Sequence, residues 1–325
     1  MTSAALSTLK LTVGAAFGMQ VVSHDMPLAG AVAIPLQTEK FYDLTGSLTF
    51  LSCTFISLFH QPLRKLVPVA SWSTLLLHPI STFSSMSQLK LLHPRQFVMS
   101  TFVILWSTRL GLFLADRAFK RGDSRFDEIK KSPSKFAGAW FMQGMWVSLT
   151  ALPVFAVNAV PAALQPRLGV RDFVAAGLWV TAFAYEVIAD RQKSQWRAQK
   201  DQKQHDEQFI SSGLWAQSRH PNYVGEVSLW AAQYLGSTTT LTSSLIAGPV
   251  LPKWMWIAAA TSPVLEYGLI RYISGVPMLE VRSTLSILDF SNKSTDKSFS
   301  RLIHLEKESG DKKYGSNPKW QEYKK

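Results

Sequence analysis

The stretch SSGLWAQSRHPNYVGEVSLWAAQYL places four polar side chains at the start of a strongly apolar segment. Pro221 suits the first turn of a helix, because that turn does not use the N–H that proline lacks. In such a helix Asn222 and Glu226 are four positions apart and share one face. The free N–H groups of the first turn, with Arg219 and His220 beside them, would attract an anion such as a cofactor phosphate. Glu226, one turn further along, could accept hydrogen bonds from an amide or a ribose.

A second group of polar residues lies in WVTAFAYEVIADRQKSQWRAQK, where an apolar run turns into a polar one. Glu186 and Asp190 are again four positions apart, and Lys193 follows about one turn later, so an acidic-to-basic stripe forms at the end of the predicted helix. The residues of this group that could bind a ribose, a phosphate or an aromatic ring are Asp190, Gln192, Lys193 and Trp196.

A third group lies in WSTRLGLFLADRAFKRGDSRFDEIKKSP. Arg109 lies inside the apolar run, where an arginine needs an anion or a carbonyl group as its partner. Glu226 or Glu186 could supply the anion, and the resulting ion pair would be structural. Arg125, in the basic loop that follows, could help to clamp a nucleotide.

Each group also has a purely structural interpretation. Arg219 could extend to lipid headgroups while Asn222 only caps its helix. The stripe from Glu186 to Lys193 could be a helix end among the headgroups, and the basic loop after Arg109 could be solvated. The residue types alone do not choose between these interpretations and a cofactor site.

The elements that must position these residues are apolar helices. Apolar residues make up 47% of the 325-residue chain, charged residues only 17%, and 11 residues are tryptophan, which is typical of a polytopic membrane protein. The net charge of +12 does not indicate nucleic-acid binding, because the charges flank the apolar segments. Cys53 is the single cysteine, so no internal disulfide or cysteine metal site can form, and we expect no metal.

Seven segments are candidate transmembrane helices by length and composition. They are residues 3–22, 43–60, 96–116, 137–160, 172–190, 223–238 and 245–273. Three prolines interrupt the last segment, so we expect a re-entrant turn followed by a helix there. The sequence therefore predicts an all-α fold, a polytopic membrane helix bundle with six or seven transmembrane helices. The Lys- and Arg-rich loops after the third and fifth spans indicate that these loops and the C-terminus are cytoplasmic.

Several motifs together resemble those of a known membrane family. They are GLWAQSRHPNYVGEVSLW, WSTRLGLFLADR with GDSRFDEIK, FMQGMWV, EVIADRQKSQW and SGVPMLE. The combination is similar to the family with a steroid 5α-reductase-type C-terminal domain, in its DUF1295 branch, and it covers about residues 96–280. The shorter pattern RHPxY is shared with the isoprenylcysteine carboxyl methyltransferase branch of the same superfamily.

The resemblance implies a multi-pass reductase of the endoplasmic reticulum that binds NADPH in a cavity facing the cytoplasm. Its target would be an activated carbon–carbon double bond in a lipid, a sterol-like molecule or a related hydrophobic substrate. By similarity, Asn222 and Glu226 would hold the nicotinamide end of NADPH, and Glu186 and Asp190 would lie near its adenosine and ribose. The steroid reductases grip the substrate carbonyl with a Glu and a Tyr of their N-terminal half, for which this chain shows no equivalents.

The catalytic residues that the resemblance implies are Glu226 and Tyr223. A hydride would pass from the nicotinamide to the β-carbon of an enone, and a tyrosine or a water held by a carboxylate would supply the proton. Tyr185 is the alternative tyrosine. The full set of residues expected to bind NADPH is Arg219, His220, Asn222, Glu226, Glu186, Asp190, Gln192, Lys193, Trp196, Arg109 and Arg125.

The same comparison predicts the organisation of the chain. Residues 1–95 form N-terminal membrane helices and an irregular connection, and residues 96–280 form the catalytic membrane domain. Residues 281–306 interrupt the expected run into the basic tail 307–325, so we interpret them as an atypical insertion or a translated intron. Two other functions stay open, namely an S-adenosylmethionine-dependent lipid methyltransferase and a non-catalytic polytopic membrane protein.

Overall fold

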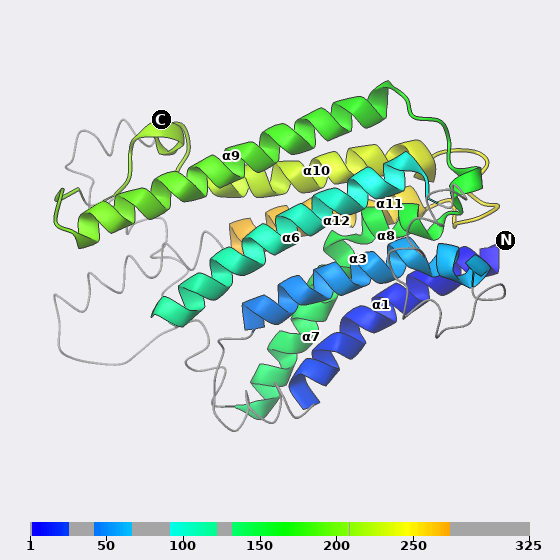
Figure 1. The fold of residues 1–325 in the computed structure, drawn as a ribbon, viewed down its shortest axis with the longest axis horizontal. Coiled ribbons are helices and arrows are strands. Elements are labelled where there is room, and N and C mark those ends of the chain that lie inside the picture. Colours follow the sequence, from blue (N-terminus) through cyan, green and yellow to red (C-terminus); the bar gives the residue numbers. More distant parts are fainter. Residues whose placement is uncertain (1, 26–41, 67–91, 122–131, 208, 274–325) are drawn as a thin grey trace. The chain divides into compact units, whose positions relative to one another are not determined.

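The computed structural model describes residues 2–25, 42–66, 92–121, 132–207 and 209–273 (Figure 1). Within these ranges the chain forms helices and turns, with one isolated β-bridge, so the predicted all-α fold is confirmed. The α-helices are α1 (Thr2–Asp25), α3 (Tyr42–Leu66), α6 (Pro94–Arg121), α7 (Pro133–Thr150), α8 (Leu152–Ala159), α9 (Val170–Asp201), α10 (Pro221–Leu241), α11 (Met255–Ala259) and α12 (Thr261–Gly268). Two 3₁₀ turns, η2 (Ala162–Leu164) and η3 (Gly213–Ala216), and a π-helix, η4 (Leu269–Ile273), complete the described elements.

Two of the described helices are long and apolar enough to cross a membrane, namely Pro94–Asp116 within α6 and the whole of α9. The α7–α8 pair makes a third span if it is counted as one, although the pair is bent by 58°. These helices correspond to three of the predicted spans, and they are compatible with an integral membrane protein. Helices α1, α3 and α10 also form where spans were expected but do not pass the same test, so the count of six or seven stays a prediction.

The predicted segment 245–273 is broken where its prolines suggested. It begins with turns through residues 245–254, which include the positive-φ Gly248, and continues as the short helices α11, α12 and η4. The predicted insertion 281–306 and the tail 307–325 lie outside the described residues.

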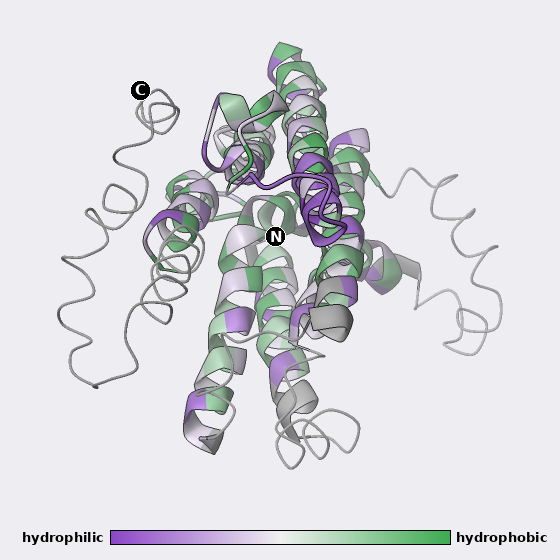
Figure 2. Cartoon of the chain, turned by 90° about the vertical axis from the view of Figure 1, so that its left-hand side faces the viewer, coloured by the Kyte–Doolittle hydropathy of each residue, from purple (hydrophilic) through white to green (hydrophobic). Residues whose placement is uncertain are grey.

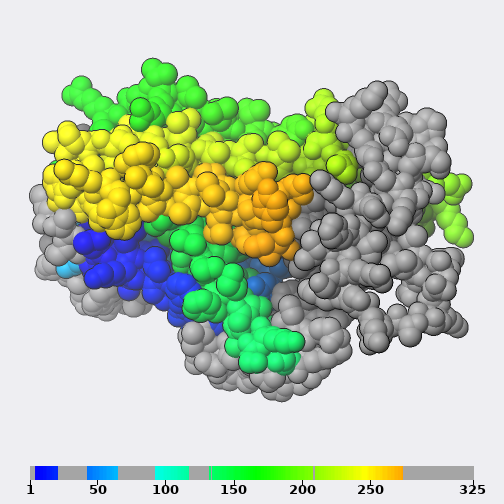
Figure 3. Space-filling view, turned by 180° about the vertical axis from the view of Figure 1, so that it is seen from behind, coloured from blue at the N-terminus to red at the C-terminus, as the bar shows by residue number. Residues whose placement is uncertain are grey.

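The chain divides into two compact units. The first comprises residues 1–179 and 230–263, and the second comprises residues 180–229 and 264–325. Within the first unit α3 packs against both α1 and α6, and α1 also packs against α7 (Figure 1). Figure 3 shows α1 (blue) and α7 (green) next to each other on one face.

An aromatic cluster forms the core of the first unit. The ring of Phe50 lies 5.0 Å from that of Trp106 and 4.9 Å from that of Trp146, both edge to face. The ring of Trp230 lies 4.9 Å from that of Trp106, again edge to face. This geometry brings the positive edge of one ring to the negative face of the next, and it locks α3, α6, α7 and the second half of α10 together.

The bend between α7 and α8 follows from the sequence. Pro153 lies in the first turn of α8 and cannot donate a backbone hydrogen bond there.

At the other end of α8, side chains satisfy the backbone carbonyls. Gln96 donates to the carbonyls of Val157 at 3.2 Å and Val160 at 2.9 Å, and Gln165 donates to that of Val157 at 2.8 Å.

The described part of the second unit consists of the second half of α9, the loop that carries η3, the first part of α10 and residues 264–273. Figure 2 colours the last turns of α9 as hydrophilic, whereas most of the helices are hydrophobic. The polar groups singled out in the sequence around residues 186–196 and 219–226 all belong to this unit.

Candidate functional site

The candidate site lies in the second unit, where the second half of α9 packs against the start of α10. Glu186 and Asp190 are 2% and 9% exposed. Asn222, in the first turn of α10, donates a hydrogen bond from Nδ2 to Asp190 Oδ1 at 3.1 Å. The Oδ1 atom of Asn222 is buried and accepts no hydrogen bond from the residues that the structure describes. A buried acceptor of this kind is costly unless a donor reaches it.

Gly225 allows the two helices to approach this closely. A Cβ atom at this position would lie 2.8 Å from Glu186 Cβ, 2.9 Å from Glu186 N and 3.0 Å from the carbonyl oxygen of Ala182. Two of these neighbours are backbone atoms that cannot turn away. The absent side chain therefore sets the contact that brings Asn222 opposite Asp190. A glycine inside a helical pattern is the signal in the sequence that indicates such a close approach.

The loop before α10 is held on α9 by three contacts. Trp215, which is 2% exposed, donates from Nε1 to the carbonyl of Ala189 at 2.9 Å. Gln192 Oε1 accepts a hydrogen bond from the backbone N–H of Leu214 at 3.0 Å. Lys193 Nζ lies 4.5 Å from the centre of the Trp215 ring, within the range of a cation–π interaction.

These contacts give Gln192 a structural task, although it was predicted to bind the cofactor. Its side chain packs against Gly213, whose φ of +60° is a left-handed conformation that favours glycine. Trp215 was not predicted as a site residue. It lies within the first motif, and its burial at the end of a polar loop could not be inferred from residue spacing.

His220 lies among positive charges. Its ring stacks on that of Tyr223, with 5.3 Å between the centres and 15° between the planes. Burial, together with the nearby charges of Lys193, Arg219 and Arg271, lowers the pKa of His220 to about 4. The imidazole is therefore neutral at pH 7. Its Nδ1 atom is buried and has no hydrogen-bond partner among the described residues.

Three cations of the second unit lie close enough to His220 to lower its pKa. Arg219 and Lys193 were predicted as anion-binding residues, and both act on His220. Arg271, in the π-helix η4, was not predicted. Its only signal in the sequence is a basic residue after an apolar run, and the distance of 51 positions from His220 hides the proximity.

Two further carboxylates belong to the same unit. Glu226 is half-buried and follows Asn222 by one helical turn on the same face of α10. Glu266, on α12, is only 3% exposed. It was not predicted, although a carboxylate within an apolar segment is a functional signal of the same kind as Glu226.

Three other predicted residues lie elsewhere. The indole of Trp196 donates to Glu207 Oε2 at 2.9 Å, and Lys200 Nζ lies 4.9 Å from the centre of its ring. Trp196 therefore holds the end of α9 against the segment that follows it. Arg109 is half-buried in the first unit, with its guanidinium 5.8 Å from the centre of the Phe113 ring. Arg125 lies outside the described residues.

The arrangement suits an anionic organic ligand better than a metal ion. In the described ranges, no three His, Cys, Asp or Glu side chains form a group that could hold a metal. The groups that the second unit does bring together are an open amide oxygen, a neutral imidazole, a tyrosine and several cations. Hydrogen bonds and positive charge of this kind can hold phosphates, hydroxyls and amides.

Comparison with known proteins identifies the family. Residues 63–292 match the family described as "Protein of unknown function (DUF1295)". The chain belongs to the DUF1295 family. The match covers most of the chain and includes all the polar residues of α9 and α10 discussed above. No curated protein and no solved structure matches this DUF1295 protein.

Proposed function

We propose that this DUF1295 protein is an NADPH-dependent membrane reductase. Its substrate would be a lipid, a sterol-like molecule or a related hydrophobic compound with an activated carbon–carbon double bond. The observation that supports this proposal most directly is the open acceptor of Asn222, which Asp190 orients through a 3.1 Å hydrogen bond beside the positively charged surroundings of His220. The family assignment is compatible with this activity but names none.

The residues of the cluster fit the chemical groups of NADPH. Lys193, Arg219 and Arg271 would attract its phosphates. Asn222 Oδ1 would accept a hydrogen bond from the carboxamide of the nicotinamide, and Glu226 would accept one from the same amide or from a ribose hydroxyl. When bound, NADPH supplies the hydride that a reductase needs.

The protein's own contribution would be orientation and a proton. Tyr223 stacks on His220, so its ring is held in one plane relative to the start of α10. We assign the Tyr223 hydroxyl as the proton donor to the α-carbon of the substrate after the hydride has reached the β-carbon. His220, being neutral at pH 7, can hydrogen-bond without adding another charge to the site.

The same positive surroundings argue against the methyltransferase alternative. The charges that lower the pKa of His220 make a further positive charge unfavourable near it. S-adenosylmethionine carries a sulfonium cation, whereas NADPH carries phosphate anions. The charges near His220 therefore favour the phosphates of the dinucleotide.

Thermal unfolding of the detergent-solubilised protein tests the proposal. A ligand at 100 times its dissociation constant stabilises the folded state by about 2.7 kcal/mol. We expect NADPH and NADP⁺ to raise the unfolding temperature, NADH to do so less because it lacks the 2′-phosphate, and S-adenosylmethionine to have no effect.

Two variants and one control sharpen the test. Asn222→Leu and Arg219→Ala should each abolish most of the protection by NADP⁺, because they remove the open acceptor and one of the cations. Gln195→Ala, an exposed change on the same stretch of α9, should leave it unchanged. Equal protection in all three variants, or none in the unaltered protein, would refute the assigned site. Protection by S-adenosylmethionine alone would favour the methyltransferase.

A further inference from the structure

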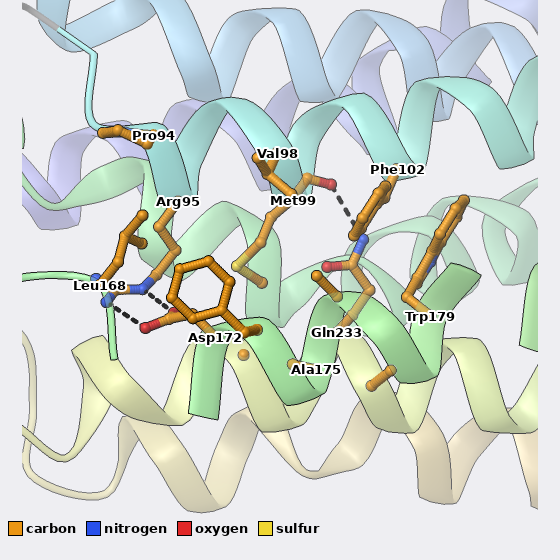
Figure 4. Close-up of a pocket in the computed structure, with 14 residues that line it drawn as sticks. Pro94, Arg95, Val98, Met99, Phe102, Leu168, Asp172, Ala175, Trp179 and Gln233 are labelled. Carbon is orange, nitrogen blue, oxygen red and sulfur yellow. Dashed lines mark hydrogen bonds and ion pairs between the residues drawn. The ribbon is translucent and has the colours of Figure 1, made fainter. Parts of the chain in front are cut away.

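A cavity in the first unit is independent of the polar cluster described above. It has a volume of about 150 Å³ and lies between the starts of α6 and α9 and the second half of α10 (Figure 4). Its apolar wall includes Val98, Met99, Phe102, Phe173 and Trp179. A dry apolar cavity of about 150 Å³ is large enough to bind a benzene-sized group.

The cavity opens beside apolar side chains that the protein leaves uncovered. Phe173 is 68% exposed, Leu168 40% and Val98 38%. The two helices that form most of the wall, α6 and α9, are also the two that are long and apolar enough to cross a membrane. A molecule that enters from this side would therefore come from the lipid phase.

The charged end of the cavity is closed to ligands. Arg95 donates from Nε to Asp172 Oδ1 at 2.6 Å and from Nη2 to Asp172 Oδ2 at 3.0 Å (Figure 4). The remaining contacts of the guanidinium, all between 3.1 and 3.2 Å, are to Gln165 Oε1, the carbonyls of Pro166 and Arg167, and Thr240 Oγ1. A guanidinium has five N–H groups, and these acceptors occupy all of them. Arg95 therefore has no donor left for a carboxylate or a phosphate.

Gln233 is a polar residue in the otherwise apolar remainder of the wall. It is 2% exposed, and its Nε2 donates to the carbonyl of Met99 at 3.0 Å (Figure 4). Its Oε1 accepts no hydrogen bond from the described residues, and the side chain lines the cavity. An amide oxygen that lines an otherwise apolar cavity favours a ligand that brings a hydrogen-bond donor.

We propose that this cavity binds a neutral membrane lipid through a hydroxyl group. The hydroxyl donates to Gln233 Oε1, and the adjoining hydrocarbon packs against Met99, Phe102 and Trp179. The ring of Phe102 stacks on that of Trp179 at 4.0 Å, which gives the hydrocarbon a flat apolar wall. Long-chain alcohols and sterols have this chemistry, whereas fatty acids and phospholipid headgroups carry charges that Arg95 and Asp172 cannot accommodate.

Photolabelling of the full chain in detergent tests the proposal. A diazirine-bearing analogue of 1-octanol is bound and irradiated, and the labelled residues are mapped by mass spectrometry. We expect labels at Met99, Phe102 or Trp179.

Competition by unlabelled 1-octanol, octyl methyl ether and octanoate is measured next, with affinities referred to their free concentrations. The ether matches the alcohol in its hydrocarbon but has no donor, so it should compete about tenfold less well. Octanoate should compete less well than the ether.

Two variants provide further outcomes. Gln233→Leu should make 1-octanol and its methyl ether equal competitors. Ala176→Leu, a change at a half-buried wall position that leaves Gln233 intact, should fill the cavity and abolish labelling. Equal competition by the alcohol and the ether in the unaltered protein would overturn the role of Gln233, even if Gln233→Leu does not fold. Unchanged labelling in Ala176→Leu would overturn the site itself.

Discussion

Replacing Gly225 by alanine tests whether the contact between α9 and α10 builds the candidate site. The new Cβ would lie 2.8 Å from Glu186 Cβ, whereas ordinary contact begins at 3.4 Å, so the helices must separate by about 0.6 Å. The same displacement would lengthen the Asn222–Asp190 hydrogen bond from 3.1 Å to about 3.7 Å. A side-chain contact at that length is no longer a hydrogen bond.

The loss of stability that the new contact of Gly225→Ala causes can be separated from the intrinsic preference of alanine for helices. Overpacking lowers the free energy of unfolding by about 1–3 kcal/mol, and exchanging a helical glycine for alanine raises it by up to about 1 kcal/mol. Gly177 lies in α9 with no atom within 4 Å of the position of its missing Cβ, so Gly177→Ala is a matched control. The difference in stability between the two variants isolates the overpacking cost.

Denaturant unfolding in detergent and protection by NADP⁺ are the two measurements. We expect Gly225→Ala to be about 1–3 kcal/mol less stable than Gly177→Ala and to bind NADP⁺ more weakly, because Asn222 is no longer oriented. If both variants unfold together and bind NADP⁺ as the unaltered protein does, the backbone contact between α9 and α10 does not organise a site.

Three other predictions concern the surroundings of the site and the first unit. The pKa of His220 is about 4 when folded and 6.5 when unfolded, so the unfolded chain takes up a proton first, and stability falls as the pH drops from 6.5 to 4. The loss is at most about 3 kcal/mol, and unfolding curves of His220→Gln should lack it. Arg95→Met leaves Asp172 buried without its partner and should lower the free energy of unfolding by about 3–5 kcal/mol. The double variant Arg95→Met/Asp172→Leu should regain part of this loss. Equal stability of the single and the double variant would contradict the ion pair. Gly213→Ala places a side chain in the left-handed region, which destabilises the loop by about 1–2 kcal/mol, and the new methyl group also contacts Gln192. The loop before α10 should therefore be cut faster in limited proteolysis.

Local patterns in the sequence predicted the helices that carry the site. The four-residue spacing of Glu186 and Asp190, and of Asn222 and Glu226, depends only on helical periodicity, and both pairs lie on helices as expected. The interruption of residues 245–273 also follows from a local property, the missing N–H of proline. Such features need no knowledge of which helices touch.

The parts that the sequence could not predict depend on contacts between distant residues. Arg271 of η4 lies close enough to His220 to lower its pKa, and no spacing in the sequence encodes that approach. Trp196 and Gln192 have side chains that could bind a cofactor, yet Glu207 accepts from the Trp196 indole and the Leu214 N–H donates to Gln192 Oε1. Residue type indicates what a side chain is able to bind, whereas the fold decides whether the binding atoms remain available.

The availability of polar atoms limits which side chains of this chain could still bind a ligand. Arg95 is by type a strong anion binder, a buried guanidinium beside a cavity, but protein acceptors use all of its N–H groups. Asn222 and Gln233 are ordinary amides, yet each uses its nitrogen within the protein and keeps an oxygen that accepts no hydrogen bond from the described residues. Because burying an unsatisfied acceptor is costly, the Asn222 oxygen has to be compensated by a bound molecule or by water. The side chain of Gln233 lines the apolar cavity, so the two sites differ in what surrounds them. Lys193, Arg219 and Arg271 act on nearby His220 and favour an anionic ligand at the first site, whereas hydrocarbon surrounds the second and favours a neutral lipid.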